Sequence, residues 1–217
     1  MKNYDTVIFD LDGTLLNTLE DLADGVNHVM EENGYPKRTL EEVRHFVGNG
    51  IRRLMEQAVP ETVSGDEFER VFEEFKSYYT EHCQIKTRAY DGIMRLLETL
   101  KKQGYDMAIV SNKNHAAVCE LNEIYFKEYI NVAIGQKDGI RKKPAPDTVI
   151  QALKELGKEK ETAIYVGDSE VDFATAENTG MDCVLVTWGF RTTDELSVFK
   201  PRAFIEKPEE LLTILQK

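Results

Sequence analysis

The chain has 217 residues, of which 41% are hydrophobic, and it carries a formal net charge of -12 at pH 7. A chain of this length and composition can bury a sizeable core, so we expect one domain, or one domain that carries a smaller insertion. The excess of acidic residues argues against a nucleic-acid-binding protein, because nucleic-acid phosphates favour surfaces rich in Lys and Arg.

The N-terminal segment, residues 1–5, leads directly into the first predicted strand and contains no apolar signal region. No stretch of the sequence has the length and hydrophobicity of a membrane span. The cysteines are far apart and lack the spacing of zinc ligands: Cys83, Cys119 and Cys183. We therefore expect a cytoplasmic protein with reduced thiols and no membrane association.

A short apolar run, Thr6–Phe9, is followed by the sequence DLDGT at residues 10–14. Side chains two residues apart on a strand share a face, so Asp10 and Asp12 are expected to point into one pocket, while Gly13 lets the chain turn. Paired buried carboxylates are costly, and a hard cation such as Mg²⁺ would relieve their repulsion and leave one carboxylate free to attack phosphorus. The alternative is an ordinary Asp-Gly turn at a strand end.

The sequence from residue 16 to residue 83 has the pattern of consecutive helices. A first helix places its apolar side chains three and four residues apart and ends near Gly34. Thr39–Glu42 forms a capping box that opens a second helix. A third helix is expected from about Ile51 to Ala58, and Ser64 is expected to cap a fourth.

From about residue 90 the sequence alternates between helices and short apolar strands. Strands are expected at residues 106–110, 132–134, 163–166 and 183–186, and helices at residues 93–102, 115–122, 147–156 and 170–178. This alternation predicts an α/β fold, a doubly wound parallel sheet with helices on both faces. We expect a sheet domain of residues 1–15 and 84–217, with residues 16–83 inserted after the first strand as an all-helical cap domain.

Ser111 and Asn112 directly follow one of the predicted strands. Ligands of parallel sheets bind at the carboxyl ends of the strands, so this hydroxyl, this amide and the neighbouring N–H groups are candidates for holding a phosphoryl oxygen. The alternative is an ordinary helix cap, for which Ser and Asn are favoured.

A basic segment, Arg141–Asp147, contains Pro144 and Pro146 and precedes a predicted helix. Two prolines restrict the backbone, and a fixed lysine can neutralise the charge of a transferring phosphoryl group. Lys143, next to the first proline, is therefore the candidate. The alternative is a solvated basic loop.

The sequence GDSEVD at residues 167–172 follows another predicted strand. Asp168, at the junction of strand and helix beside Gly167, is a candidate metal ligand, and Asp172 lies four residues further on the same helix face. Acidic residues in a first helical turn also simply favour the helix dipole. Because all four motifs follow strands of one parallel sheet, we expect them to converge on one crevice.

These motifs resemble, in order, those of the haloacid dehalogenase superfamily: DxDGT, a strand-end Ser-Asn, a Lys before Pro-x-Pro, and GDSxxD. The resemblance spans essentially the whole chain, and the helical insertion resembles the C1 cap of that superfamily. Residues 47–50 and 54–58, together with Gly189–Arg191, are similar to the corresponding parts of bacterial phosphoglycolate phosphatases.

The resemblance implies a Mg²⁺-dependent phosphatase that hydrolyses a small phosphorylated metabolite, 2-phosphoglycolate, through an aspartyl-phosphate. It makes Asp10 the nucleophile and Asp12 the acid that protonates the leaving oxygen. It also implies that Mg²⁺ is held by Asp10, the backbone carbonyl of Asp12, and Asp168, with Asp172 supporting the ligands. Residues of the other two motifs would bind the phosphoryl oxygens: Ser111, Asn112 and Lys143.

Other activities of the same architecture stay open, namely an inorganic pyrophosphatase and a sugar-phosphate phosphatase. A phosphosugar mutase is disfavoured, because such mutases carry a histidine ten residues past Asp12, where this chain has Leu22. A phosphonate hydrolase is disfavoured because that relative replaces the second acid of the first motif. A phosphate-accepting signalling receiver uses similar groups on a doubly wound sheet, but it needs neither Asp12 nor a cap.

Asn49 and Arg52 of the predicted cap are candidates for contacting a carboxylate of the substrate, since arginine suits bidentate recognition. Solvated helix positions are the alternative, which we favour for Arg53. The histidines show no ligand spacing and are expected to be structural or at the surface: His28, His45, His82 and His115.

The expected partner is a small phosphorylated metabolite, and no nucleic acid or membrane is expected. The net negative charge does not exclude an anionic substrate, because a local cation and a few basic side chains decide the potential inside a pocket. We expect a monomer or a homodimer.

Overall fold

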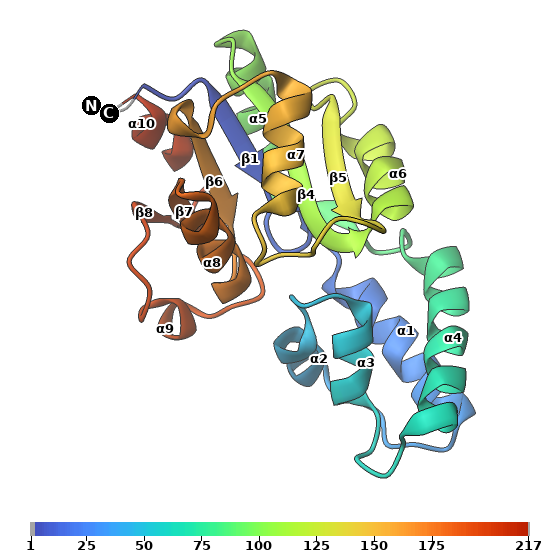
Figure 1. The fold of residues 1–217 in the computed structure, drawn as a ribbon. Helices are drawn as coiled ribbons and strands as arrows, with labels where there is room; N and C mark the ends of the chain where they lie inside the picture. The colour runs from blue at the N-terminus through green and yellow to red at the C-terminus, as the bar shows by residue number, and fades with distance from the viewer. Residues whose placement is uncertain (1–2, 217) are drawn as a thin grey trace. The chain divides into compact units, whose positions relative to one another are not determined.

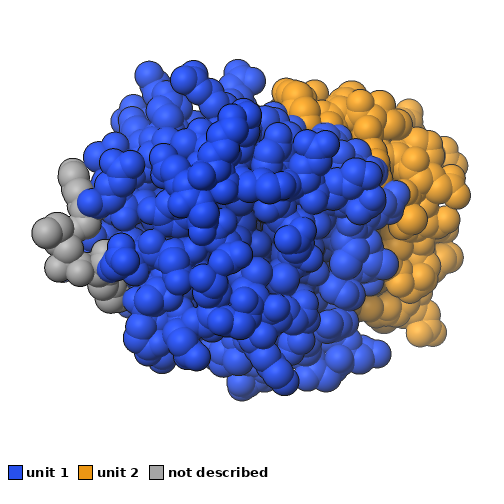
Figure 2. Space-filling model, turned by 90° about the horizontal axis from the view of Figure 1, so that it is seen from above, with its two compact units in different colours: residues 1–15, 89–217 blue, residues 16–88 orange. Residues whose placement is uncertain are grey.

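The computed structural model describes residues 3–216 and divides into two compact units (Figures 1 and 2). The sheet unit comprises residues 1–15 and 89–217, and the helical unit comprises residues 16–88. The chain thus passes from the helical unit back to the sheet unit between residues 88 and 89, later than the crossing after residue 83 that the sequence suggests.

Four helices form most of the helical unit: α1 (Leu19–Glu32), α2 (Leu40–Phe46), α3 (Ile51–Ala58) and α4 (Gly65–His82). The apolar face of α4 is buried, through Phe68, Val71, Phe72, Phe75 and Tyr79. The predicted capping box of Thr39 and Glu42 is present at the start of α2. Ser64 precedes α4 as expected, but its side chain makes no capping hydrogen bond. The first residue of the helix, Gly65, has a positive φ of 58°, so the backbone between Ser64 and the helix differs from that of an ordinary N-cap.

Asp21 explains why residues 84–88 belong to the helical unit. It is a buried carboxylate on α1 that accepts hydrogen bonds from the backbone N–H of Lys86, at 2.9 and 3.1 Å, and of Thr87, at 2.8 Å. The residues that follow form β3 (Arg88–Ala89), which pairs with β2 (Leu16–Asn17) in a two-stranded sheet. This anchoring is between residues distant in sequence, so the helical pattern alone does not predict it.

Six parallel strands form the main sheet in the order β5-β4-β1-β6-β7-β8. They are β1 (Thr6–Phe9), β4 (Asp106–Asn114), β5 (Val132–Gln136), β6 (Ala163–Gly167), β7 (Asp182–Val186) and β8 (Ala203–Ile205). The strands after β1 extend the sheet first to one side of it and then to the other. The predicted doubly wound parallel sheet is confirmed, and its order reverses at β1, where ligands of such sheets bind.

Helices cover the sheet: α5 (Ile93–Lys102), α6 (His115–Tyr125), α7 (Asp147–Leu156), α8 (Glu170–Thr179), α9 (Thr193–Leu196), α10 (Glu210–Leu215) and a short 3₁₀ helix (Lys160–Thr162). In Figure 1, α7 lies across the face of the sheet formed by β4 and β5. Alternate strand residues pack in one core cluster with residues of α7 and α8, including Ile8, Val110, Ile134 and Tyr165. Residues that point to the opposite face are buried too, including Val7, Phe9, Ile109 and Ile164. Both faces of the sheet are therefore covered.

The predicted strands and helices of the sheet unit are present, and the main difference is at β4. This strand was expected to end at Val110, whereas it continues through Asn114. The shorter elements β8, α9 and α10 were not predicted, because three to six residues carry too little periodic pattern. Among the described residues, no helix is both long enough and apolar enough to cross a membrane.

Replacing Asp21 with Ala should lower the free energy of unfolding by about 2 to 4 kcal/mol, because it leaves the buried N–H of Thr87 and the partly buried N–H of Lys86 without their charged acceptor. Asp24→Ala is the matched control, since Asp24 forms an exposed ion pair with Lys86, and its loss should change stability by less than about 1 kcal/mol. Urea unfolding followed by circular dichroism measures both variants. Equal effects of the two substitutions would contradict the anchoring role of Asp21.

Candidate active site

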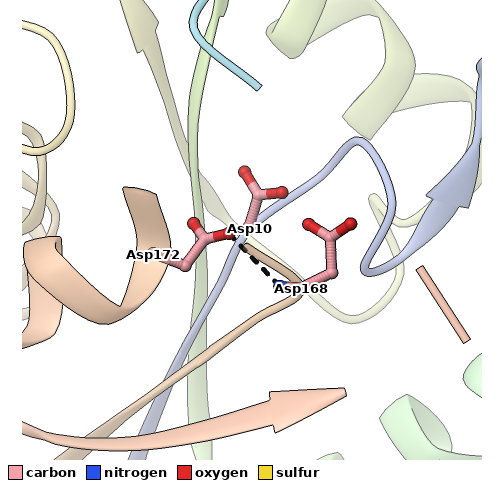
Figure 3. A group of neighbouring side chains, drawn as sticks. All are labelled: Asp10, Asp168 and Asp172. Carbon is pink, nitrogen blue, oxygen red and sulfur yellow. Dashed lines mark hydrogen bonds between the residues drawn. The ribbon is translucent and has the colours of Figure 1, made fainter. Parts of the chain in front are cut away.

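The acidic residues predicted at two strand ends meet at the carboxyl edge of the central strands. Asp10 directly follows β1, Asp168 directly follows β6, and Asp172 lies in the first turn of α8. Each offers a carboxylate oxygen, and these oxygens lie within 4.8 Å of one another (Figure 3). All three side chains are buried, with exposed fractions of 6%, 2% and 1%.

Lys143 is the cation that joins this acidic cluster. Its Nζ lies 2.6 Å from Oδ1 of Asp10, 2.7 Å from Oδ1 of Asp172 and 3.1 Å from the hydroxyl of Tyr165. The side chain of Lys143 is only 3% exposed. The predicted basic loop therefore does not leave Lys143 in solvent, but inserts it between two carboxylates.

Asn112 holds the loop that carries this lysine. Its side-chain amide donates a hydrogen bond of 3.1 Å to the backbone carbonyl of Lys143. The sequence predicted a phosphoryl-binding role for Asn112, and this contact instead favours a role in positioning Lys143. Tyr165, which sequence reasoning missed, reaches the cluster from β6 and donates a hydrogen bond of 2.9 Å to Asp172.

Asp172 serves two structures at once. Its Oδ2 accepts hydrogen bonds from the backbone N–H of Asp168 and Ser169 and from the Ser169 hydroxyl, while the Ser169 hydroxyl accepts from the N–H of Asp172. This is the capping box that starts α8. Because Oδ1 faces Lys143 and Tyr165, both carboxylate oxygens already have protein donors, which supports the predicted supporting role.

Asp168 is held in place by the chain around it. Its Oδ2 accepts a hydrogen bond of 2.6 Å from the backbone N–H of Phe190. Gly13 packs against the same carboxylate, and a Cβ at this glycine would lie 2.3 Å from Oδ2 of Asp168. Its φ of 93° is also strained for other residues. The glycine of the first motif therefore both turns the chain and makes room for the acid of the last one.

Burial and excess negative charge set the protonation of this cluster, which has three carboxylates and one ammonium group. Burial raises the pKa of Asp10 well above its usual range, and the charges of the other two acids add to this effect against the opposing charge of Lys143. Burial and the charge of Asp172 raise the pKa of Asp168 to about 7.

Asp172 and Lys143 behave as an ion pair. Burial alone would raise the pKa of Asp172, but the charge of Lys143 and the hydrogen bonds that Asp172 accepts lower it overall. Burial likewise disfavours the charged lysine, but the charges of Asp10 and Asp172 outweigh it and hold the pKa of Lys143 well above its usual value. The lysine therefore stays charged at neutral pH.

Asp12 faces a different set of groups from Asp10. Its Oδ2 lies 3.5 Å from the hydroxyl of Ser111, and its Oδ1 lies 3.3 Å from Nζ of Lys113. The alternative interpretation of Ser111 as a helix cap is not realised, because β4 continues past this residue and the N-cap of α6 is Asn114. Lys113 was not predicted as a site residue, although it belongs to the polar sequence that follows Val110.

The candidate residues of the helical unit have contacts of their own. Arg52 forms a bidentate ion pair with Glu69, at 2.9 and 2.8 Å, and its guanidinium lies over the ring of Phe72. These contacts support a structural role for Arg52. Arg53 pairs with Glu56, and Asn49 lies in the loop between α2 and α3.

The histidines also have structural contacts. The rings of His28 and His82 both stack with the ring of Tyr78. Nδ1 of His45 lies 2.8 Å from the carbonyl of Glu41. The imidazole of His115 accepts a hydrogen bond from a backbone N–H of β5.

The donors in the acidic cluster fit a hard divalent cation. They are carboxylate oxygens, the ligands that such cations prefer, and they carry more negative charge than Lys143 neutralises. Asp10 and Asp168 are the best placed to bind it, because the oxygens of Asp172 already have several protein donors.

Comparisons with known proteins agree with the fold and the motifs. Residues 7–186 match the family of haloacid dehalogenase-like hydrolases. A phosphoglycolate phosphatase of Aquifex aeolicus is 30% identical over 211 residues, which cover 96% of this chain and 95% of that protein. Phosphoglycolate phosphatase 1 of Pseudomonas aeruginosa is 31% identical over 212 residues, covering 95% of this chain and 78% of that protein.

Solved structures give the same picture. The crystal structure of a candidate phosphoglycolate phosphatase from Lactobacillus delbrueckii subsp. bulgaricus has a TM-score of 0.93 and 36% identity, and the match covers 98% of both chains. A predicted phosphoglycolate phosphatase from Haemophilus somnus has a TM-score of 0.91 at 28% identity over 99% of both chains.

The raised pKa of Asp168 makes the stability of the metal-free protein depend on pH. The folded state keeps a proton on Asp168 that the unfolded state loses near its ordinary pKa of 3.8, so this group costs increasing stability as the pH rises from about 4 to about 7. Asp168→Asn removes that cost. In the presence of a chelator, the advantage of the variant should be about 1 kcal/mol near pH 4.5 and should grow to about 4 kcal/mol at pH 8, because a difference of one pKa unit is worth about 1.4 kcal/mol.

Urea unfolding at both pH values measures this difference, with Asp138→Asn as a control at an exposed carboxylate. A variant that is less stable than the wild type at pH 8 would contradict the assigned cost, as would a difference that does not change with pH.

Proposed function

The chain belongs to the family of haloacid dehalogenase-like hydrolases, and from this premise we propose that it hydrolyses 2-phosphoglycolate to glycolate and phosphate through an aspartyl-phosphate. The observation that carries the reaction type is the buried carboxylate of Asp10, fixed by Lys143 beside two further acids. The substrate is proposed because several similar proteins are named phosphoglycolate phosphatases.

In the first step the carboxylate of Asp10 attacks phosphorus, the bond from phosphorus to the ester oxygen breaks, and Asp12 gives its proton to the leaving oxygen. In the second step Asp12 takes a proton from water, which attacks the phosphorus and releases Asp10 and phosphate. The different surroundings of the two acids support this division of roles. Asp10 faces a buried ammonium group, whereas Asp12 is turned toward Ser111 and Lys113.

Positioning and charge neutralisation are most of what phosphoryl transfer requires. Lys143 fixes one oxygen of Asp10 and offers positive charge near the reacting phosphorus. Ser111, together with the backbone near Leu11, is the proposed donor to the phosphoryl oxygens.

We further propose Mg²⁺ as the cofactor, held by Asp10, Asp168 and the backbone carbonyl of Asp12, with Asp172 in support. When bound, the ion would neutralise the negative charge of the phosphoryl group. The excess of buried carboxylates over Lys143 supports this assignment.

A mutase that returns the phosphoryl group to a sugar is not favoured. The position where such mutases carry a histidine is Leu22, an apolar side chain buried within the helical unit, which cannot transfer a proton. We also propose a cytoplasmic location, since the described cysteines are free and two of them are buried, as in a reducing compartment.

A substrate panel with Mg²⁺ tests the proposed function. We expect kcat/KM for 2-phosphoglycolate to exceed that for pyrophosphate and for small sugar phosphates by at least about tenfold, because specificity is a ratio between substrates. Asp10→Asn should abolish turnover, while Asp138→Asn at an exposed site serves as the control. Mg²⁺-dependent turnover by Asp10→Asn would exclude it as the nucleophile, and a preference for pyrophosphate would replace the proposed substrate.

Asp12→Asn should lower the rate with 2-phosphoglycolate by about 10² to 10⁴, because general acid-base help is lost. With p-nitrophenyl phosphate, whose leaving group needs no proton, the variant should release about one equivalent of p-nitrophenol rapidly and then turn over slowly. Rapid-quench kinetics measure this burst. A near-normal rate with 2-phosphoglycolate would assign the proton transfer to another group.

A further inference from the structure

The buried cations of the described part of the sheet unit are Lys113, Lys143 and Arg191. Lys143 is held by two carboxylates and a hydroxyl, and Arg191 forms a bidentate ion pair with Glu170, at 2.8 and 2.9 Å. Lys113 is the one of these three that is next to Asp12, with its Nζ 3.3 Å from Oδ1. This ammonium group is therefore near the proposed acid rather than the nucleophile.

The backbone around Lys113 is fixed from two sides. Its N–H donates a hydrogen bond of 3.1 Å to the hydroxyl of Ser111, two residues earlier on β4. On the neighbouring strand, Gly135 packs so closely that a Cβ there would lie 2.6 Å from the carbonyl oxygen of Lys113. The side chain is 6% exposed, so its ammonium group is largely withdrawn from water.

The chemistry of the leaving group suggests a partner for this ammonium group. In the proposed reaction Asp12 contacts the ester oxygen, and in 2-phosphoglycolate the carboxylate carbon is only two bonds from that oxygen. A cation about 3 Å from the acid is thus within reach of the carboxylate. A shielded ammonium group binds a carboxylate more strongly than an exposed one does.

We propose that Lys113 is the specificity-determining residue of this enzyme, and that it binds the carboxylate of the leaving group and so selects phosphate esters of small hydroxy acids. This inference rests on the proposed function and deepens it. The alternative is that Lys113 only positions the side chain of Asp12, in which case its loss would slow every substrate alike.

A comparison of 2-phosphoglycolate with 2-hydroxyethyl phosphate, which has a hydroxymethyl group in place of the carboxylate, separates these roles. We expect Lys113→Gln to lower the ratio of kcat/KM for the two esters by roughly 10- to 100-fold, the range for a lost hydrogen bond to a charged group. Lys113→Arg, which keeps a cation, should retain part of the preference. Lys127→Gln is the matched control at an exposed lysine and should leave the ratio at its wild-type value.

A ratio that stays unchanged in Lys113→Gln, with both esters slowed equally, would overturn the proposal and leave Lys113 as a positioning residue. Thermal unfolding by circular dichroism establishes that each variant is folded. If Lys113→Gln does not fold, Lys113→Arg and Lys113→Met are compared in the same way, and equal ratios in these two variants would contradict recognition by charge.

Binding measurements separate a failure of this inference from a failure of the proposed function. In the Asp10→Asn background, isothermal titration calorimetry gives the Kd of each ester without turnover. We expect tighter binding of 2-phosphoglycolate, and loss of that preference when Lys113→Gln is added. A Lys113-dependent preference in a protein whose wild type hydrolyses neither ester would refute the proposed function alone. If the wild type hydrolyses 2-phosphoglycolate but Lys113→Gln changes neither the ratio of kcat/KM nor the ratio of Kd for the two esters, this inference alone would be refuted.

Discussion

The ammonium group of Lys143 lies between the buried carboxylates of Asp10 and Asp172, and the arrangement of the site depends on this contact. A charge removed from water is costly, so each of these groups is stable in the interior only because the others are present. Lys143 does not neutralise the cluster completely, because Asp168 adds a third carboxylate. The remaining carboxylate is the physical basis of the proposed hard-cation site, even in a protein that is already strongly acidic.

The order of the strands creates this contact from distant parts of the chain. β1 lies between β4 and β6, so the residues that follow these three strands are neighbours at one edge of the sheet. Lys143 comes from the loop after β5, at the side of the sheet, and the amide of Asn112 on β4 holds that loop near the centre. The strand β4, next to the central strand, therefore contributes Ser111 to the site and also, through Asn112, positions the loop of Lys143.

The sequence predicts the acids and the lysine because each follows an apolar run or a rigid segment, and strand ends of a parallel sheet must meet. It does not predict Tyr165, because an aromatic residue inside a strand is expected in the core, and only the hydroxyl reaches the site. Lys113 was missed because the predicted strand stops at Val110, whereas β4 continues and directs this side chain toward Asp12. Whether Tyr165 and Lys113 belong to the site depends on the direction of their side chains, which short-range sequence patterns do not determine. The extent of the helical unit depends in the same way on the long-range contacts of Asp21.

The capping box of α8 couples the buried charged cluster to the stability of a helix. Asp172 closes the first turn of the helix through Ser169 and also accepts the hydrogen bond of Lys143. The first turn of the helix and the charged cluster therefore depend on the same side chain. A substitution at Asp172 would therefore weaken the start of α8 and remove a partner of Lys143 at the same time, so the stability of this helix and the order of the cluster are coupled.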